Sequence, residues 1–250
     1  MYAEGLQELR RALEGEEGME VFVVAPEHQR SAASHAITLH KPLYVYDIRL
    51  EGVKVPMWAV SGTPADCTKM GVLALLDRPP EIVVSGINRG PNLGTDVLYS
   101  GTVSAAIEAS ILGLPALAVS LATFEEADYS FAALFTRRML GLLRRHPLPP
   151  GAILNVNIPA LEPPEIAGVA VTRLGVRYYR DVFHPRVDPR GRKYYWLAGE
   201  VRHGEEEGTD IAAVERNMIS ITPIHLRITD ESLFPSLEEL SGELRRMLEK

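Results

Sequence analysis

The sequence has a single cysteine and no long apolar run, and each shortage excludes a class of protein. Cys67 is the only cysteine among 250 residues, so no disulfide can form within the chain and a reducing compartment is favoured. No apolar run approaches the roughly 18 residues that a membrane-spanning helix needs, and the first residues do not resemble a signal peptide. We therefore expect a cytoplasmic protein with no membrane partner.

Positive charge is also in short supply. The chain has 26 Lys and Arg residues against 33 Asp and Glu residues, which gives a formal net charge of −7. This balance argues against a protein that holds nucleic acid by electrostatic attraction, but it leaves room for a small nucleotide in a local site. We expect no stable nucleic-acid partner.

Several well-known catalytic motifs are missing. No G-x-x-x-x-G-K-[ST] segment occurs, and no G-x-G-x-x-G segment follows an apolar run, so neither a P-loop nor a dinucleotide site is expected. There is no G-x-S-x-G turn to present a serine nucleophile, and no H-E-x-x-H or C-x-x-C pair to bind zinc.

Strand and helix patterns alternate along the first two thirds of the chain. Short apolar runs predict strands at residues 21–25, 58–60, 82–84, 116–120 and 153–158. Helical patterns separate them, at residues 65–76, along an apolar face of Val103, Ile107, Ile111 and Leu114, and at residues 131–145. This alternation predicts an α/β protein with a doubly wound, mostly parallel sheet.

The last third breaks this rhythm. Residues 176–183 and 193–197 are rich in aromatic side chains and flank a segment with Pro and Gly turn signals, so they predict a protruding antiparallel β-hairpin. A further strand is expected at residues 218–223 and an amphipathic C-terminal helix at residues 237–248. Exposed aromatic side chains would be costly in a monomer, so we expect a homodimer or tetramer.

Residues 84–106 form the most informative segment. They contain Asn88, Asn92 and three glycines, followed by Ser100, Gly101 and Thr102 at the start of a helix. A helix start offers unpaired N–H groups and the positive end of a dipole, which suit a phosphate, and no Asp or Glu occurs at residues 97–107. The alternative is a Gly-rich connector with a Ser/Thr helix cap.

Hydroxyl and amide side chains follow three of the predicted strands. They are Ser31, Thr63 and Asn88, and their oxygen atoms are hard ligands suited to Mg²⁺ or Mn²⁺. Taken singly, each is more often a hydrogen-bonding loop residue. Their recurrence at strand ends, beside a helix start that suits an anion, favours a phosphate site.

These segments together resemble the SurE family of stationary-phase survival proteins, which act as metal-dependent nucleotidases. The matching segments are VVAPEHQRSAASHAIT (23–38), VSGTPADC (60–67), VVSGINRGPNLGTDVLYSGTVSAA (83–106), ILNVNIP (153–159), YYW (194–196), GTD (208–210) and SITP (220–223). The resemblance implies a Rossmann-like core at residues 1–160. It also implies that residues 161–250 hold the hairpin, the final strand and a C-terminal helix that joins subunits.

The resemblance further implies hydrolysis of nucleoside monophosphates, chiefly 5′, with one divalent ion, Mg²⁺ or Mn²⁺, in each subunit. The metal ligands of the family fall on Ser31 and Asn88. Its phosphate contacts fall on Asn92 and on Ser100, Gly101 and Thr102.

The chain departs from the family pattern at its N-terminus. Family members begin with a short strand ending in Asn-Asp-Asp-Gly, whose Asp pair binds the metal, whereas this chain opens on a helix with the apolar stripe Leu6, Leu9 and Leu13. The missing strand predicts a gap in the sheet and exposure of that stripe, and it leaves the catalytic residues unassigned. The alternative function is therefore a non-catalytic remnant that binds nucleotide or phosphate.

Four other polar residues have competing interpretations. Asp96 could orient a metal-bound water or Asn92, but organising the loop backbone is as good an explanation. Asp66 is explained by capping of its helix, and His35 and His40 are more simply surface or core histidines than general acids.

Overall fold

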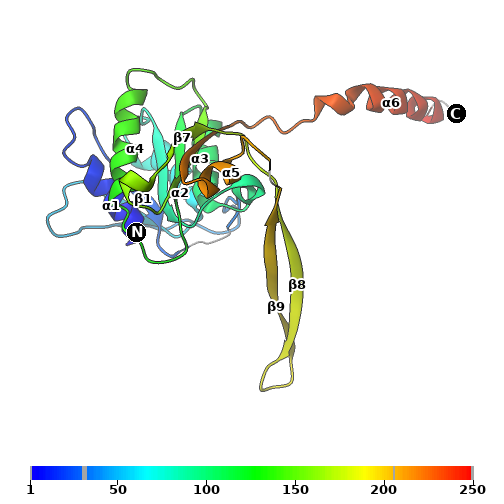
Figure 1. Ribbon diagram of the computed structural model, residues 1–250, viewed down its shortest axis with the longest axis horizontal. Helices are drawn as coiled ribbons and strands as arrows, with labels where there is room; N and C mark the ends of the chain where they lie inside the picture. The colour runs from blue at the N-terminus through cyan, green and yellow to red at the C-terminus, as the bar shows by residue number, and fades with distance from the viewer. Residues whose placement is uncertain (1, 30–32, 205, 249–250) are drawn as a thin grey trace.

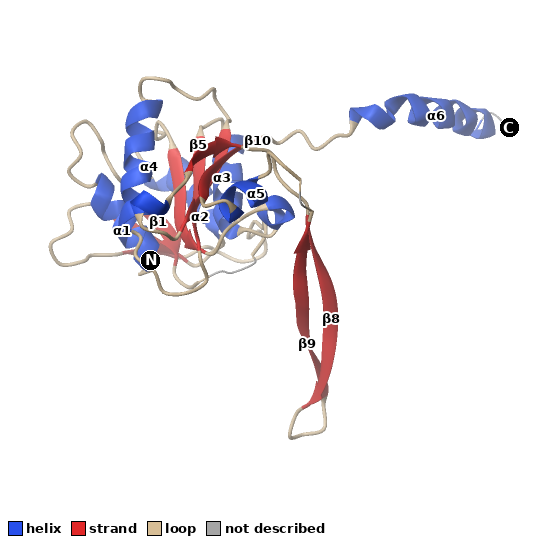
Figure 2. Ribbon diagram, viewed as in Figure 1, coloured by secondary structure: helices blue, strands red, loops and turns tan. Residues whose placement is uncertain are grey.

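The computed structural model describes residues 2–29, 33–204 and 206–248. The chain folds into an α/β body from which a long β-hairpin and the C-terminal helix project (Figures 1 and 2). The predicted fold class is confirmed. Among the helices in the described ranges, none is both long and apolar enough to span a bilayer.

The larger sheet has five strands in the order β4-β5-β6-β10-β7. They are β4 (Val83–Arg89), β5 (Ala116–Ala122), β6 (Ile153–Pro159), β10 (Met218–Ile224) and β7 (Gly168–Val171). The strands β4, β5 and β6 are parallel, whereas β10 runs antiparallel to β6 and parallel to β7. Two strands from beyond residue 160 therefore complete the sheet.

A smaller sheet holds three strands in the order β1-β3-β2. They are β1 (Val23–Pro26), β3 (Met57–Val60) and β2 (Val45–Asp47). Strands β1 and β3 are parallel, with Val23 opposite Met57, and β2 runs antiparallel to β3.

The two sheets are separated between β1 and β4. Within the described ranges, each of these strands pairs on one edge only, β1 with β3 and β4 with β5. A cavity of about 1900 Å³ is lined by both strands, with Val24 and Val84 among its lining residues. We call the part of this cavity between β1 and β4 the slot. It lies where the sequence predicts a gap.

Helices cover the larger sheet on both faces. On one face, α1 (Glu4–Leu13) and α4 (Ser130–Leu143) share a core with Leu117 and Val119 of β5. On the other, α3 (Gly101–Ile111) packs over Ala116 and Ala118 of the same strand, and α2 (Pro64–Met70) packs against α3. Alanines on that face let α3 approach the strand closely.

The helix α1 is held tightly despite the divided sheet. Leu9 and Leu13 are only 4% and 8% exposed, so the prediction that this apolar stripe is exposed is wrong. The stripe packs in the core beside Leu140 of α4. A Cβ on Gly5 would lie 2.2 Å from the carbonyl oxygen of Ile87, so only glycine allows α1 to sit this close to β4.

The hairpin is confirmed and is longer than predicted. Its strands β8 (Arg177–Val187) and β9 (Lys193–His203) pair antiparallel, with Val187 opposite Lys193. Aromatic side chains along it are exposed, including Phe183 at 64% and Trp196 at 66%.

The helix α6 (Phe234–Leu248) lies away from the body at the end of an extended segment (Figure 1). A short helix, α5 (Asp210–Glu215), precedes β10.

Candidate functional site

The start of α3 has the geometry of an anion site. Ser100 is the N-cap residue, and its side-chain oxygen accepts a hydrogen bond from the Val103 N–H at 3.1 Å. The Ser100 hydroxyl still has a hydrogen to donate. Gly101 and Thr102 are the first helical residues, where N–H groups have no acceptor within the helix. Because no acidic residue lies in this first turn, its positive dipole end is not neutralised locally.

The predicted phosphate residues and the predicted metal ligand Asn88 line one cavity. Asn88, Asn92, Ser100, Gly101 and Thr102 all line the cavity that contains the slot. The slot therefore opens onto the start of α3. Whether these residues contact phosphate stays a prediction. Ser31 lies outside the described residues, so its assignment as a metal ligand also stays a prediction.

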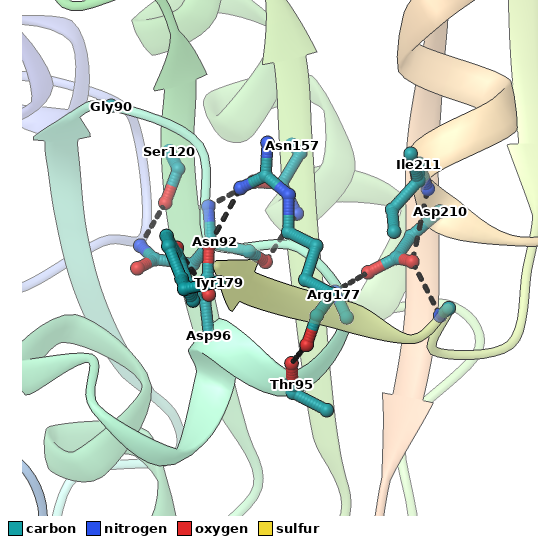
Figure 3. A network of polar contacts seen from close by, with 12 residues as sticks. Gly90, Asn92, Thr95, Asp96, Ser120, Asn157, Arg177, Tyr179, Asp210 and Ile211 are labelled. Carbon is teal, nitrogen blue, oxygen red and sulfur yellow. Dashed lines mark hydrogen bonds and ion pairs between the residues drawn. The ribbon is translucent and has the colours of Figure 1, made fainter. Parts of the chain in front are cut away.

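Asn92 is held by side chains of two parallel strands, β5 and β6 (Figure 3). Its backbone N–H donates to Oδ1 of Asn157 at 2.7 Å, and its carbonyl oxygen accepts from the side chains of Asn155 and Asn157. Its own side-chain amide donates to the Ser120 hydroxyl at 2.7 Å. Asn92 is therefore buried, and four hydrogen bonds fix the position of the loop at this residue. Asn88 is oriented separately, through a 2.9 Å bond from its amide to the Gly90 carbonyl.

Asp96 contacts the base of the hairpin rather than Asn92. Its carboxylate accepts hydrogen bonds from Arg177 Nη1 at 2.6 Å and from the Tyr179 hydroxyl at 2.7 Å (Figure 3). Its backbone carbonyl accepts from the N–H groups of Tyr99 and Ser100. Of the two interpretations of Asp96, organisation of the loop backbone is the one this geometry favours.

The donor set does not by itself fit a divalent ion. No group of three or more His, Cys, Asp or Glu side chains within residues 2–29, 33–204 and 206–248 could hold a metal. Asn88 is neutral, whereas Mg²⁺ is usually held by one or two carboxylates.

One charge cluster, around a buried carboxylate, was not predicted from the sequence. Glu108 of α3 is only 2% exposed, and it pairs with Nε2 of His35 at 3.0 Å and Nζ of Lys69 at 2.7 Å. His35 is thus a structural partner of a carboxylate, in agreement with the simpler interpretation, and His40 is exposed. Arg89 was also overlooked; it lies at the end of β4 and lines the cavity.

Asp66 is confirmed as a capping residue. Thr63 caps α2, with its hydroxyl accepting from the Asp66 N–H, and the Asp66 carboxylate accepts from the Thr63 N–H at 2.9 Å. Thr38 adds two bonds, from its hydroxyl at 2.6 Å and its N–H at 3.0 Å. Burial raises the pKa of the Asp66 carboxyl, but the bonds from Thr38 and Thr63 outweigh burial and lower this pKa below 3.8.

Replacing Asp66 should therefore destabilise the protein in a pH-dependent way. Asp66→Asn removes the charge that these donors stabilise, and we expect a loss of about 1–3 kcal/mol in unfolding free energy at pH 7. A lowered pKa contributes stability above the unfolded value, and this contribution is lost as the pH falls through the folded value. Urea unfolding at several pH values should show the two proteins converging below pH 3.8. A constant difference at every pH would contradict this account.

Comparison with known proteins agrees with this architecture. The family model "Survival protein SurE" matches residues 1–181. The 5′-nucleotidase SurE of Carboxydothermus hydrogenoformans is 53% identical over 233 residues, covering 92% of this chain and 88% of that protein. That of Moorella thermoacetica is 56% identical over 213 residues, covering 85% and 82%. The crystal structure of the SurE protein from Aquifex aeolicus superimposes with a TM-score of 0.80 at 37% identity, covering 96% of this chain and 95% of that one. The chain belongs to the SurE family, whose matching relatives carry the name of a hydrolase, 5′-nucleotidase.

Proposed function

We propose that this protein, when its metal site is complete, hydrolyses nucleoside 5′-monophosphates to nucleoside and phosphate, as a metal-dependent phosphomonoesterase. The observation that carries the proposal is the start of α3, where Ser100, Gly101 and Thr102 line the same cavity as Asn88 and Asn92. The names of the relatives support the nucleotide as substrate. We further propose a cytoplasmic homodimer or tetramer.

In this proposal the protein's own groups hold the phosphate. The N–H groups of Gly101 and Thr102 and the hydroxyls of Ser100 and Thr102 donate hydrogen bonds to its oxygen atoms, and Asn92 fixes the loop from which they start. Such fixed donors are most effective where charge develops in the transition state. One Mg²⁺ or Mn²⁺ ion would have Ser31 and Asn88 among its ligands, with its carboxylate ligands unassigned.

The alternative function is that of a protein that binds nucleotide or phosphate without catalysis. Among the residues that the structure describes, no acidic cluster could hold a divalent ion. A chain with an anion site and no complete metal site would bind a nucleotide or phosphate without hydrolysing it. This is the non-catalytic alternative.

The metal requirement separates the two functions. We expect the 250-residue chain to bind Mn²⁺ or Mg²⁺ no better than millimolar by calorimetry and to cleave para-nitrophenyl phosphate near background, because neutral ligands hold these ions weakly. The same chain preceded by a short strand ending in Asn-Asp-Asp-Gly should release phosphate from AMP when Mn²⁺ is added. Binding of AMP by both proteins with release by neither would support the non-catalytic function. Rapid metal-dependent turnover by the 250-residue chain would mean that acids inside it, Asp96 first, provide the metal site.

A further inference from the structure

The loop that leads to the proposed phosphate site is hydrogen-bonded to the base of the hairpin. It follows the end of β4 at Arg89, is held at Asn92 by side chains of β5 and β6, passes through the 3₁₀ turn Gly94–Leu98, and ends at Ser100, the cap of α3. Asp96 lies in the middle of this turn. Its carbonyl oxygen accepts from the N–H groups of Tyr99 and Ser100, so the position of Asp96 sets the position of the cap.

Two side chains of β8 hold the carboxylate of Asp96. Arg177 and Tyr179 are two residues apart on the strand, which places them on the same face. Arg177 donates to Oδ2 and Tyr179 donates to Oδ1, so both carboxylate oxygens are engaged (Figure 3). The side chains of Asp96 and Arg177 are 15% and 16% exposed, so water screens this ion pair much less than a surface pair.

A second set of bonds fixes the beginning of the turn to the same part of the chain. Asp210 accepts from the N–H of Gly94 through Oδ2 and from the N–H of Gly175 through Oδ1, both at 2.8 Å. Gly94 has a φ of +54°, and a Cβ there would lie 2.6 Å from the Gly175 carbonyl oxygen. The two backbones are therefore in direct contact. The Thr95 hydroxyl also donates to the carbonyl oxygen of Arg177.

We propose that Asp96 is a positioning residue of the phosphate site, and that Arg177 and Tyr179 of the hairpin hold it in place. The hairpin base is then part of the site, although its distal part projects into solvent (Figure 1). This inference rests on the proposed function, since it assigns a role to the loop that presents Ser100 and Thr102 to phosphate. If these contacts only oriented the hairpin, their removal would leave the loop at residues 94–100 unchanged.

Amide hydrogen exchange on the full chain without ligand separates these two roles. Arg177→Gln and Tyr179→Phe each remove one donor to Asp96. We expect exchange across residues 94–103 to quicken by about tenfold in each variant. Arg186→Gln and Tyr194→Phe make the same chemical changes on exposed parts of the hairpin, and they should leave these residues unchanged. Faster exchange confined to the hairpin, with residues 94–103 unaffected, would overturn the proposal.

Binding of AMP in the presence of Mg²⁺ provides the second measurement. We expect Arg177→Gln and Tyr179→Phe to weaken AMP binding several-fold. Arg177→Lys should have an affinity for AMP between those of Arg177→Gln and the unaltered chain, because lysine keeps the charge but not the planar guanidinium group. Equal affinity in all variants would overturn the positioning role. If the unaltered chain binds no AMP, the proposed function fails, whereas the exchange data still decide whether the hairpin holds the loop.

Discussion

A polypeptide strand placed in the slot between β1 and β4 is expected to raise the melting temperature by about 10 °C or more. Among the described residues, β1 pairs with β3 and β4 pairs with β5, each on one edge only, and the slot between β1 and β4 is lined by apolar side chains such as Val24 and Val84. An inserted strand would pair with both edges and bury its own apolar residues. In a chain of this size each kcal/mol shifts the melting temperature by roughly 2–4 °C, so this rise corresponds to a net gain of about 3–5 kcal/mol in unfolding free energy.

The comparison needs a matched control. The 250-residue chain should be melted beside the same chain with a short apolar segment joined before Met1, and beside a third protein whose added segment carries prolines at alternate positions. Proline cannot donate to a ladder, so the third protein should melt like the first. Equal melting temperatures for all three would show that the slot does not accept a strand. That result would strengthen the non-catalytic alternative.

Loss of either hydroxyl at the start of α3 is expected to reduce kcat/KM for AMP by roughly 10–1000-fold, by analogy with removal of one oxyanion donor. Ser100→Ala and Thr102→Ala should be measured in the chain that carries the Asn-Asp-Asp-Gly strand. Folding should change little, apart from roughly 1 kcal/mol for the lost cap at Ser100. Ser110→Ala, at the other end of the same helix, is the control and should keep its activity. Full activity of both test variants on AMP and GMP would place the phosphate elsewhere.

The strands that build the site could be predicted because their signals are local. Apolar runs correctly predicted the strands β3, β4, β5 and β6, and the Ser-Gly-Thr triplet correctly predicted the start of α3. The strands β2 and β7 were missed. Both are short, β7 alternates half-buried with exposed residues, and neither carries a run of buried side chains.

The packing of α3 was less predictable. A single apolar face containing Ile107 and Ile111 was expected, but Ile111 is 53% exposed and the helix buries Ser104, Ala105 and Glu108 instead. The reason is that α3 is covered by α2 as well as by the sheet, so small and paired polar residues replace a simple apolar stripe.

Long-range polar partners could not be predicted. Asp96 is hydrogen-bonded to Arg177, which is 81 residues away in the sequence, and Glu108 to His35, which is 73 residues away. No spacing rule in a single sequence connects such pairs, because their proximity depends on how the hairpin and the loops return to the sheet. The division into residues 1–160 and 161–250 stays a proposal, with β7 and β10 joining the sheet from the second part.

The central claim is that phosphate binds where the slot meets the start of α3. The most direct measurement is an amide chemical-shift titration of the protein with AMP in the presence of Mg²⁺. The account predicts the largest shifts at Gly101 and Thr102, with smaller ones at Asn92, and almost none for adenosine without the phosphate. Saturable shifts that leave Gly101 and Thr102 unmoved, or equal shifts with adenosine and AMP, would contradict it.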